Sequence, residues 1–227
     1  MTIRASGSGV WLLLLLASAC TRGVIGPRGA FTREPIPVAA LHATSGQLEQ
    51  LDAFQARVAV PMLRAQVTPP TAAGIELRFV YEGATTQAAK LASGELRRQL
   101  GLKLLSFDSC NVTYVMWRIA PRAQVHVSQK VNAGQTRHEE CGDRGYTDLE
   151  PSWHSDALPA VLPGQEHRLT VRLRSDQMRV SVDGVVVWRG AVPLPAGSMP
   201  SPYVGIRSDN ARFRFSLSGV VDTETEQ

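Results

Sequence analysis

Apolar and polar residues alternate along most of the chain from residue 75 onward. Side chains of a β-strand point in turn to opposite faces, so this period of two predicts strands that each bury one face. The alternation breaks at 132–165 and then resumes. The apolar faces of the predicted strands are Ile75, Leu77, Phe79 and Tyr81; Leu96, Leu100, Leu102 and Leu104; Val115, Trp117 and Ile119; Val125, Val127 and Val131; Leu169, Val171 and Leu173; Met178, Val180 and Val182; and Phe213, Phe215 and Leu217.

A hairpin signal lies between two of these runs. Asp183-Gly184 separates the alternating residues that end at Val182 from the apolar run Val185–Trp188. An Asp-Gly pair between two strands is the strongest short-range sign of a tight β-hairpin. About nine strands with turns between them predict an all-β, two-sheet antiparallel sandwich over residues 75–221.

The N-terminal part of the chain lacks this alternation. Residues 20–46 are rich in Gly and Pro and are expected to form a tether, and residues 47–74 are expected to form a short helix or an irregular lead-in. Leu48, Leu51 and Phe54 recur at helical spacing, with Ser45 as an N-cap, whereas a strand through 56–60 is the competing interpretation. Residues 222–227 are expected to be a polar tail.

Residues 1–19 are interpreted as a targeting segment. Arg4 precedes the apolar run Val10–Leu16, which is too short to span a bilayer, because spanning needs about 20 residues. The following Ala17–Cys20 stretch resembles the lipobox of bacterial lipoproteins, although that family prefers Leu where Ala17 stands. The resemblance implies cleavage before Cys20 and a lipid on its thiol. An ordinary secretory signal cut after Ala19 is the alternative.

Both interpretations of the targeting segment place the chain outside the cytoplasm. Thr21, and not Asp, follows the cysteine, which by resemblance to enterobacterial sorting implies the outer membrane or surface of a Gram-negative bacterium. Cleavage would remove Arg4 and no acid, lowering the net charge from +4 to +3. Basic residues do not cluster in runs, so no nucleic-acid partner is expected.

The two remaining cysteines, Cys110 and Cys141, form an even pair. In an oxidising compartment such a pair predicts a disulfide. A metal cluster around His138–Asp143 is the alternative, but its spacing matches no zinc pattern, so no metal and no cofactor are expected.

The C-terminal half resembles the concanavalin A-like, laminin G-like jelly roll. The resemblance lies in the strand Glu166–Leu173, the hairpin through Asp183-Gly184, the Gly-containing strand Tyr203–Ser208 and the last strand with alternating Phe213 and Phe215. It covers roughly residues 75–220 and implies a jelly-roll fold. These motifs indicate fold much better than function.

Motifs for catalysis are missing from the sequence. Some glucanases of this superfamily carry an E-x-D-x-x-E strand, which this chain lacks, and no G-x-S-x-G, P-loop or GxGxxG occurs. Glu139, Glu140 and Asp143 fall in one loop, without the spacing that makes two carboxylates face one substrate. No catalytic residue is therefore assigned.

Polar and aromatic residues on two predicted strands and the 132–165 insertion are the candidates for ligand binding. If the strands pair, their polar side chains share a face, and the insertion would fold over it to complete a shallow groove for a glycan. Alternatively, Tyr146 and Trp153 plug the loop onto the core, and the Arg-rich strand faces are simply solvated. The candidates are Tyr114, Arg118, His126, Ser128, Lys130, Tyr146, Trp153 and His154.

These features indicate an envelope-anchored, lectin-like domain that binds glycan or another extracellular ligand without catalysis. A glycoside-processing enzyme of the same fold and a structural or interaction lipoprotein are the alternatives. The expected partners are the membrane, through a lipid on Cys20, and a glycan or an envelope protein.

Overall fold

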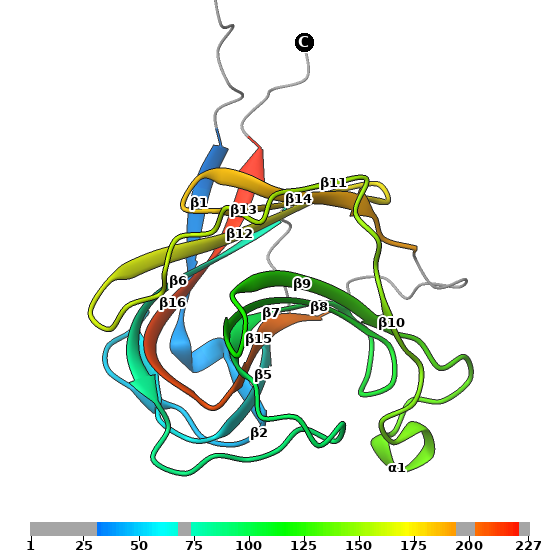
Figure 1. Cartoon of the computed structure of the whole chain (residues 1–227), viewed down its shortest axis with the longest axis horizontal. Coiled ribbons are helices and arrows are strands. Elements are labelled where there is room, and N and C mark those ends of the chain that lie inside the picture. The colour runs from blue at the N-terminus through cyan, green and yellow to red at the C-terminus, as the bar shows by residue number, and fades with distance from the viewer. Residues whose placement is uncertain (1–30, 68–73, 194–202, 223–227) are drawn as a thin grey trace, which may run out of the picture.

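The alternating segments of the sequence form strands, and each strand pairing of the described chain is antiparallel. The computed structural model describes residues 31–67, 74–193 and 203–222. Within these residues the strands build two sheets, A and B, that stack face to face (Figure 1). The predicted two-sheet antiparallel sandwich is confirmed.

Sheet A contains the long β6 and β16 at its centre. Its spatial order is β11 (Trp153–His154), β14 (Val185–Ala191), β13 (Gln177–Val182), β12 (Glu166–Arg174), β6 (Gly74–Ala84), β16 (Ala211–Asp222), β4 (Ala56–Val58) and β3 (Glu49–Gln50), and β1 (Phe31–Ile36) also pairs with β16.

Sheet B lies beneath sheet A in Figure 1 and arches, so that its outer face, turned away from sheet A, is its concave face. Its spatial order is β10 (Tyr146–Asp148), β9 (Gln124–Lys130), β8 (Val112–Ala120), β7 (Arg98–Ser106), β15 (Tyr203–Asp209), β5 (Met62–Val67) and β2 (His42–Ser45). The described helices are short: η1 (Val38–Ala40) and α1 (His138–Cys141). None of them is long and apolar enough to cross a membrane.

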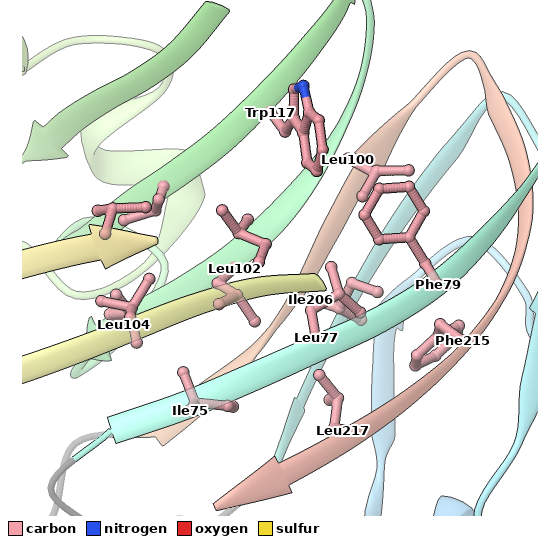
Figure 2. Packing of buried hydrophobic residues seen from close by; sticks show 14 of the residues in the cluster. Ile75, Leu77, Phe79, Leu100, Leu102, Leu104, Trp117, Ile206, Phe215 and Leu217 are labelled. Atoms are coloured by element: carbon pink, nitrogen blue, oxygen red, sulfur yellow. The ribbon is translucent and has the colours of Figure 1, made fainter. Parts of the chain in front are cut away.

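The core lies between the sheets and is filled by the apolar faces of their central strands (Figure 2). Leu77 and Phe79 of β6 face Leu100 and Leu102 of β7, and all four are almost fully buried. The Phe79 ring meets Trp117 of β8 edge to face, with centroids 5.5 Å apart. Burial of such side chains is the main stabilising contribution to a sandwich of this kind.

The Asp183-Gly184 pair forms the predicted hairpin between β13 and β14. Both residues have positive φ, 49° for Asp183 and 84° for Gly184, as a two-residue turn of this kind requires. Asp183 also accepts hydrogen bonds from the His167 ring at 2.8 Å and from the Arg168 backbone N–H at 2.7 Å. The turn is therefore fixed to β12 as well as to its own strands.

The expected tether is wrong from residue 31 onward. Residues 31–36 form β1, which pairs with the last six residues of β16, and 42–45 form β2 at the edge of sheet B. Ile36 is the one buried residue of β1, so the apolar alternation that marks a strand is missing. Pro35 suggested a break, but proline is tolerated in an edge strand such as this one.

The expected short helix or irregular lead-in over 47–74 is also wrong, because 62–67 form β5 of sheet B and no helix forms within 47–58. Residues 49–50 and 56–58 form β3 and β4, which pair with each other, so the competing strand interpretation is correct for the second segment. Asp52 Oδ1 accepts the backbone N–H groups of Phe54 and Gln55 at 2.7 and 2.8 Å and so closes a turn. Leu51 and Phe54, whose spacing suggested a helix, remain exposed on this turn.

The insertion between β9 and β12 connects the two sheets. β10 extends the edge of sheet B, and β11 extends the edge of sheet A, with the chain rising from one to the other in Figure 1. The predicted disulfide is confirmed: Cys110 and Cys141 are bonded, with Cα atoms 5.9 Å apart. It joins the start of β8 to α1. The targeting segment and Cys20 lie outside the described residues.

Candidate functional site

Strand register brings polar side chains into rows across the outer face of sheet B. Alternate residues of these strands fill the core, so the residues between them point outward. Because paired residues share a face, the register fixes which of them are neighbours. From β5 through β15, β7 and β8 to β9 the rows are Gln66, Gly205, Lys103, Tyr114 and Ser128; Arg64, Arg207, Gly101, Met116 and His126; and Met62, Asp209, Gln99, Arg118 and Gln124.

Two tyrosine rings and an arginine stack on this face. Tyr146 of β10 lies over Tyr114 of β8, with centroids 6.2 Å apart and an interplanar angle of 23°. The Arg207 guanidinium lies 4.6 Å from the Tyr114 ring centre. Burial raises the pKa of the Tyr114 hydroxyl to about 12, with a smaller contribution from Tyr146. Tyr114 is thus a buried platform, while Tyr146 remains 44% exposed.

An ion-pair network adjoins the Arg207 side of this stack. The buried Asp209 carboxylate accepts hydrogen bonds from Arg64 at 2.8 Å, from Arg207 at 3.1 Å and from the Gln99 amide at 2.7 Å. Burial alone would raise the pKa of Asp209, but the two guanidinium groups and the amide outweigh it and hold that pKa below its usual range. Asp209 is therefore ionised at neutral pH and fully engaged.

Lys103 lies beside this network in the centre of the face. It is 7% exposed, and among the described residues its ammonium has one hydrogen-bond partner, the Gln66 side-chain oxygen at 3.4 Å. Burial, and then the nearby Arg64 and Arg207, lower the pKa of Lys103 to about 8. This ammonium has no carboxylate partner in the described part of the chain.

Lys130, one of the predicted binding residues, serves the loop structure instead. Its ammonium donates to the Ser109 and Gly142 carbonyl oxygens at 3.2 and 2.6 Å and lies 3.2 Å from the Cys141 sulfur. It is 2% exposed and lies 5.5 Å from the Tyr146 ring centre. Its hydrogen-bonding capacity is used within the protein.

The remaining sheet B candidates lie on the same face, as the pairing of β8 with β9 requires. Ser128 is opposite Tyr114, and His126 is opposite Met116. His126 Nε2 lies 3.1 Å from Asp148 of β10, and burial lowers the pKa of His126 despite that carboxylate. Arg118 lies at the end of the face, next to Gln99. The structure therefore brings together six of the eight predicted residues.

The predicted placement of Trp153 and His154 over this face is wrong. They form β11 and pair with Arg189 and Trp188 of β14 in sheet A. Trp153 is 47% exposed and its ring centre lies 5.7 Å from the Arg189 guanidinium. The insertion leaves sheet B after β10, so its later aromatic residues belong to the other sheet.

The sequence predicts the strand Tyr203–Ser208 but assigns none of its residues to the site, although β15 supplies the most charge to this face. Arg207 and Asp209 alternate in β15, and Arg64 and Gln99 meet them only because β15 pairs with both β5 and β7. The alternation of Gly205, Arg207 and Asp209 on one side of a strand is visible in the sequence. Its neighbours are not, because β5 and β7 are more than 95 residues away in the chain.

The acidic residues of the insertion stabilise its backbone. Glu140 Oε2 accepts the N–H groups of Thr136 and Arg137 at 2.9 and 3.1 Å, and these bonds lower the pKa of Glu140. This is a capping arrangement at the start of α1. No group of three or more His, Cys, Asp or Glu in the described ranges is arranged to hold a metal ion.

Comparison with known structures shows a jelly-roll fold. A carbohydrate-binding module from Bacillus subtilis, CBM66, matches 80% of this chain and 94% of its own at 11% identity and a TM-score of 0.51. The Caenorhabditis elegans galectin LEC-6 matches 82% of this chain and 98% of its own at 9% identity and a TM-score of 0.40. No protein-family model matches the sequence, and no curated protein does. At these identities the similarity shows the fold alone.

Proposed function

We propose that this chain is an envelope-anchored, lectin-like protein that binds a glycan on the outer face of sheet B and does not turn it over. The observation that carries the proposal is the exposed Tyr146 ring, stacked on Tyr114 beside a row of hydrogen-bonding side chains. An exposed ring that is held flat can stack on the apolar face of a sugar, and neighbouring polar groups bond its hydroxyls.

Further support comes from the shape of the fold. Sheet B presents these side chains on a concave, regular surface, and regular strands hold side chains more rigidly than loops do. The similarity in fold to a carbohydrate-binding module is consistent with this use of the sheet. A rigid surface reduces the entropy that ordering would cost on binding.

Binding without turnover follows from the state of the carboxylates on this face. Glycoside hydrolysis needs two carboxyl groups free to act as acid and nucleophile or base. Asp209 is 1% exposed and bonded to two arginines, and Asp148 lies against His126. Asp209 is therefore not free, and the exposed Asp148 alone does not supply the pair that hydrolysis needs.

Screening the full chain on a glycan array tests the proposal. The affinity of three variants is then measured for the glycans that bind. Tyr146→Ala should lower affinity about tenfold, because it removes the apolar area that the ring buries and a stacking contribution of about 0.5–1.5 kcal/mol. Tyr146→Phe should retain most of the affinity. Trp153→Ala is the matched control, since Trp153 is equally exposed but belongs to sheet A.

Each alternative function gives a different result in this experiment. Absence of glycan binding would contradict the proposal and favour an interaction protein of the envelope. Release of reducing sugar from a bound glycan would favour the glycoside-processing enzyme. Equal losses of affinity with Tyr146→Ala and Trp153→Ala would show that the binding surface is not centred on Tyr146.

The anchoring part of the proposal rests on the Ala17–Cys20 stretch and its resemblance to a lipobox. The disulfide between Cys110 and Cys141 is consistent with an oxidising compartment such as the bacterial envelope. A lipid on Cys20 would hold the domain at the membrane, where the outer face of sheet B is available to extracellular or envelope glycans.

A further inference from the structure

The centre of the sheet B outer face carries more positive than negative charge. Arg64, Lys103 and Arg207 come from three adjacent strands, and Asp209 is the one carboxylate within this group. Both oxygens of Asp209 are already bonded, Oδ1 to Arg64 and Oδ2 to Arg207 and Gln99. Three cations and one anion leave a surplus of two positive charges.

One of the two surplus charges is the Lys103 ammonium. Both arginines bond to Asp209, which neutralises one of their two charges, whereas the Lys103 ammonium has a single neutral partner, Gln66, at 3.4 Å. A cation that is 7% exposed and has only a neutral partner is unfavourable, because it has lost most of its hydration without gaining a counter-charge. An anion beside Lys103 would relieve this cost.

Two glycines keep side chains away from the cations. Gly205 lies between Gln66 and Lys103 in its row, and Gly101 lies opposite Arg207 in the next. A Cβ on Gly205 would stand 2.0 Å from the Ala65 carbonyl oxygen, and one on Gly101 2.1 Å from that of Val115. Strand packing therefore requires glycine at both positions, so neither position places a side chain between the cations.

We infer that Arg64, Lys103 and Arg207 bind an anionic group of the ligand, so that the glycan of the proposed function is an acidic saccharide. The inference rests on that function and specifies its substrate class. The anion bonds the Lys103 ammonium and the terminal N–H groups of Arg207, whose bond to Asp209 is made through Nε, and Arg64 adds its positive charge, while the sugar ring stacks on Tyr146. Carboxylate and sulfate share the required charge and oxygen acceptors.

Affinity electrophoresis of the full chain separates the two sources of charge with matched polymers. Polygalacturonate is compared with its methyl ester, and dextran sulfate with dextran, so that each pair differs in charge alone. The inference predicts retardation by the charged member of at least one pair. It also predicts that Lys103→Met lowers this affinity at least about tenfold, the effect expected for one charge-assisted hydrogen bond.

Lys90→Met is the matched control, because it removes the same charge from an exposed position. A thermal scan of both variants checks the fold. Lys103→Met should unfold at the same temperature as the unmodified chain or higher, since it removes a buried, unpaired cation. Adding tens of millimolar sulfate should raise the melting temperature of the unmodified chain more than that of Lys103→Met, with sodium chloride at equal ionic strength as reference.

The outcomes separate this inference from the proposed function. Binding of neutral glycans alone, unaffected by Lys103→Met, would overturn the acidic ligand and leave glycan binding in place. Equal losses with Lys103→Met and Lys90→Met would show an unspecific effect of net charge and overturn the site. Absence of any glycan on the array would overturn both, and an equal response of the two chains to sulfate would remove the anion site independently.

Discussion

Two lysines on one face of sheet B have opposite surroundings. Lys130 is enclosed by the Ser109 and Gly142 carbonyl oxygens and the Cys141 sulfur. Lys103 faces two arginines and one amide oxygen. Both are polar residues of strands in which polar and apolar residues alternate, and only the contacts made by distant segments distinguish a structural lysine from a candidate binding residue.

Lys130→Met is expected to lower stability and to leave ligand affinity unchanged. The substitution leaves the Ser109 and Gly142 carbonyl oxygens without a donor, at a cost of about 1–3 kcal/mol. Urea unfolding of the variant, with Lys90→Met as control, measures this loss. If the variant keeps its stability but no longer binds the glycan, Lys130 is a binding residue.

Binding of an acidic saccharide should weaken as pH rises through 8. Burial, and then Arg64 and Arg207, lower the pKa of Lys103 to about 8, so the free protein loses this proton above that pH, whereas the anion binds the protonated form. Affinity should therefore fall about tenfold between pH 7 and pH 9. Titration calorimetry at both pH values measures the change.

The other charged groups around Lys103 do not produce this dependence. Arg64 on β5 and Arg207 on β15 stay protonated, Asp209 stays ionised, and the pKa of Tyr114 on β8 is raised to about 12. In the Lys103→Met variant the affinity should no longer fall between pH 7 and pH 9. A fall of the same size in that variant would assign the pH effect to another group.

At the scale of elements, the insertion depends on the Cys110–Cys141 disulfide. The bond closes a loop with a sequence separation of 31 and fixes α1 next to the start of β8. Beyond α1 the chain makes three pairs between β10 and β9, flanked by backbone hydrogen bonds from Val131 to Gly145 and from Leu149 to Val127, before it crosses to sheet A. Tyr146 belongs to that short pairing.

Replacing both cysteines by serine should destabilise the domain by about 3 kcal/mol, the loop entropy released in the unfolded state. For a domain of this size the melting temperature should fall by about 6–12 °C. Calorimetry with and without reductant measures it, and reductant should have no effect on the double variant. Unchanged melting of the double variant would show that the insertion is held by its other contacts.

Deleting residues 31–45 should also destabilise the sandwich, because these residues form β1 and β2. The deletion removes Ile36 and Val38 from the core and six backbone pairs from β16. Loss of the two buried aliphatic side chains alone costs about 3–6 kcal/mol. Urea unfolding of the deletion variant and the full chain checks this. Identical urea midpoints for the two proteins would support the interpretation of residues 31–46 as a tether.

At the scale of the whole molecule, β1 places the folded domain close to the proposed anchor. Eleven residue steps separate Cys20 from Phe31, a reach of at most about 40 Å when fully extended. The domain would therefore stay near the membrane surface to which its lipid is attached, much closer than a tether ending at residue 46 would allow.

Cys20→Ser is expected to release the protein from the membrane fraction. Serine cannot accept the thioether-linked lipid, and no helix in the described ranges spans a membrane in its place. Fractionation and mass spectrometry of the mature N-terminus measure the outcome. A soluble native chain that begins at an unmodified Cys20 would contradict the anchor and support the ordinary secretory signal.

Sequence by itself determined the strands of the sandwich that have one apolar face, the Asp183-Gly184 turn and the pairing of Cys110 with Cys141. The strands and the turn depend on local backbone geometry, and the disulfide depends on an even number of cysteines. The same local rules failed for β1, because an edge strand with one buried residue carries almost no alternation, and for 47–58, where a turn built by Asp52 imitates helical spacing.

Only the tertiary structure decided which polar side chains share a surface. Arg64, Lys103, Arg207 and Asp209 lie on three strands whose order in sheet B does not follow the chain, so no window of sequence contains them together. Tyr146 and Trp153, seven residues apart, were separated onto different sheets by one crossing of the chain. Long-range pairing fixes such neighbours, because strand order and register depend on the burial of every apolar face at once.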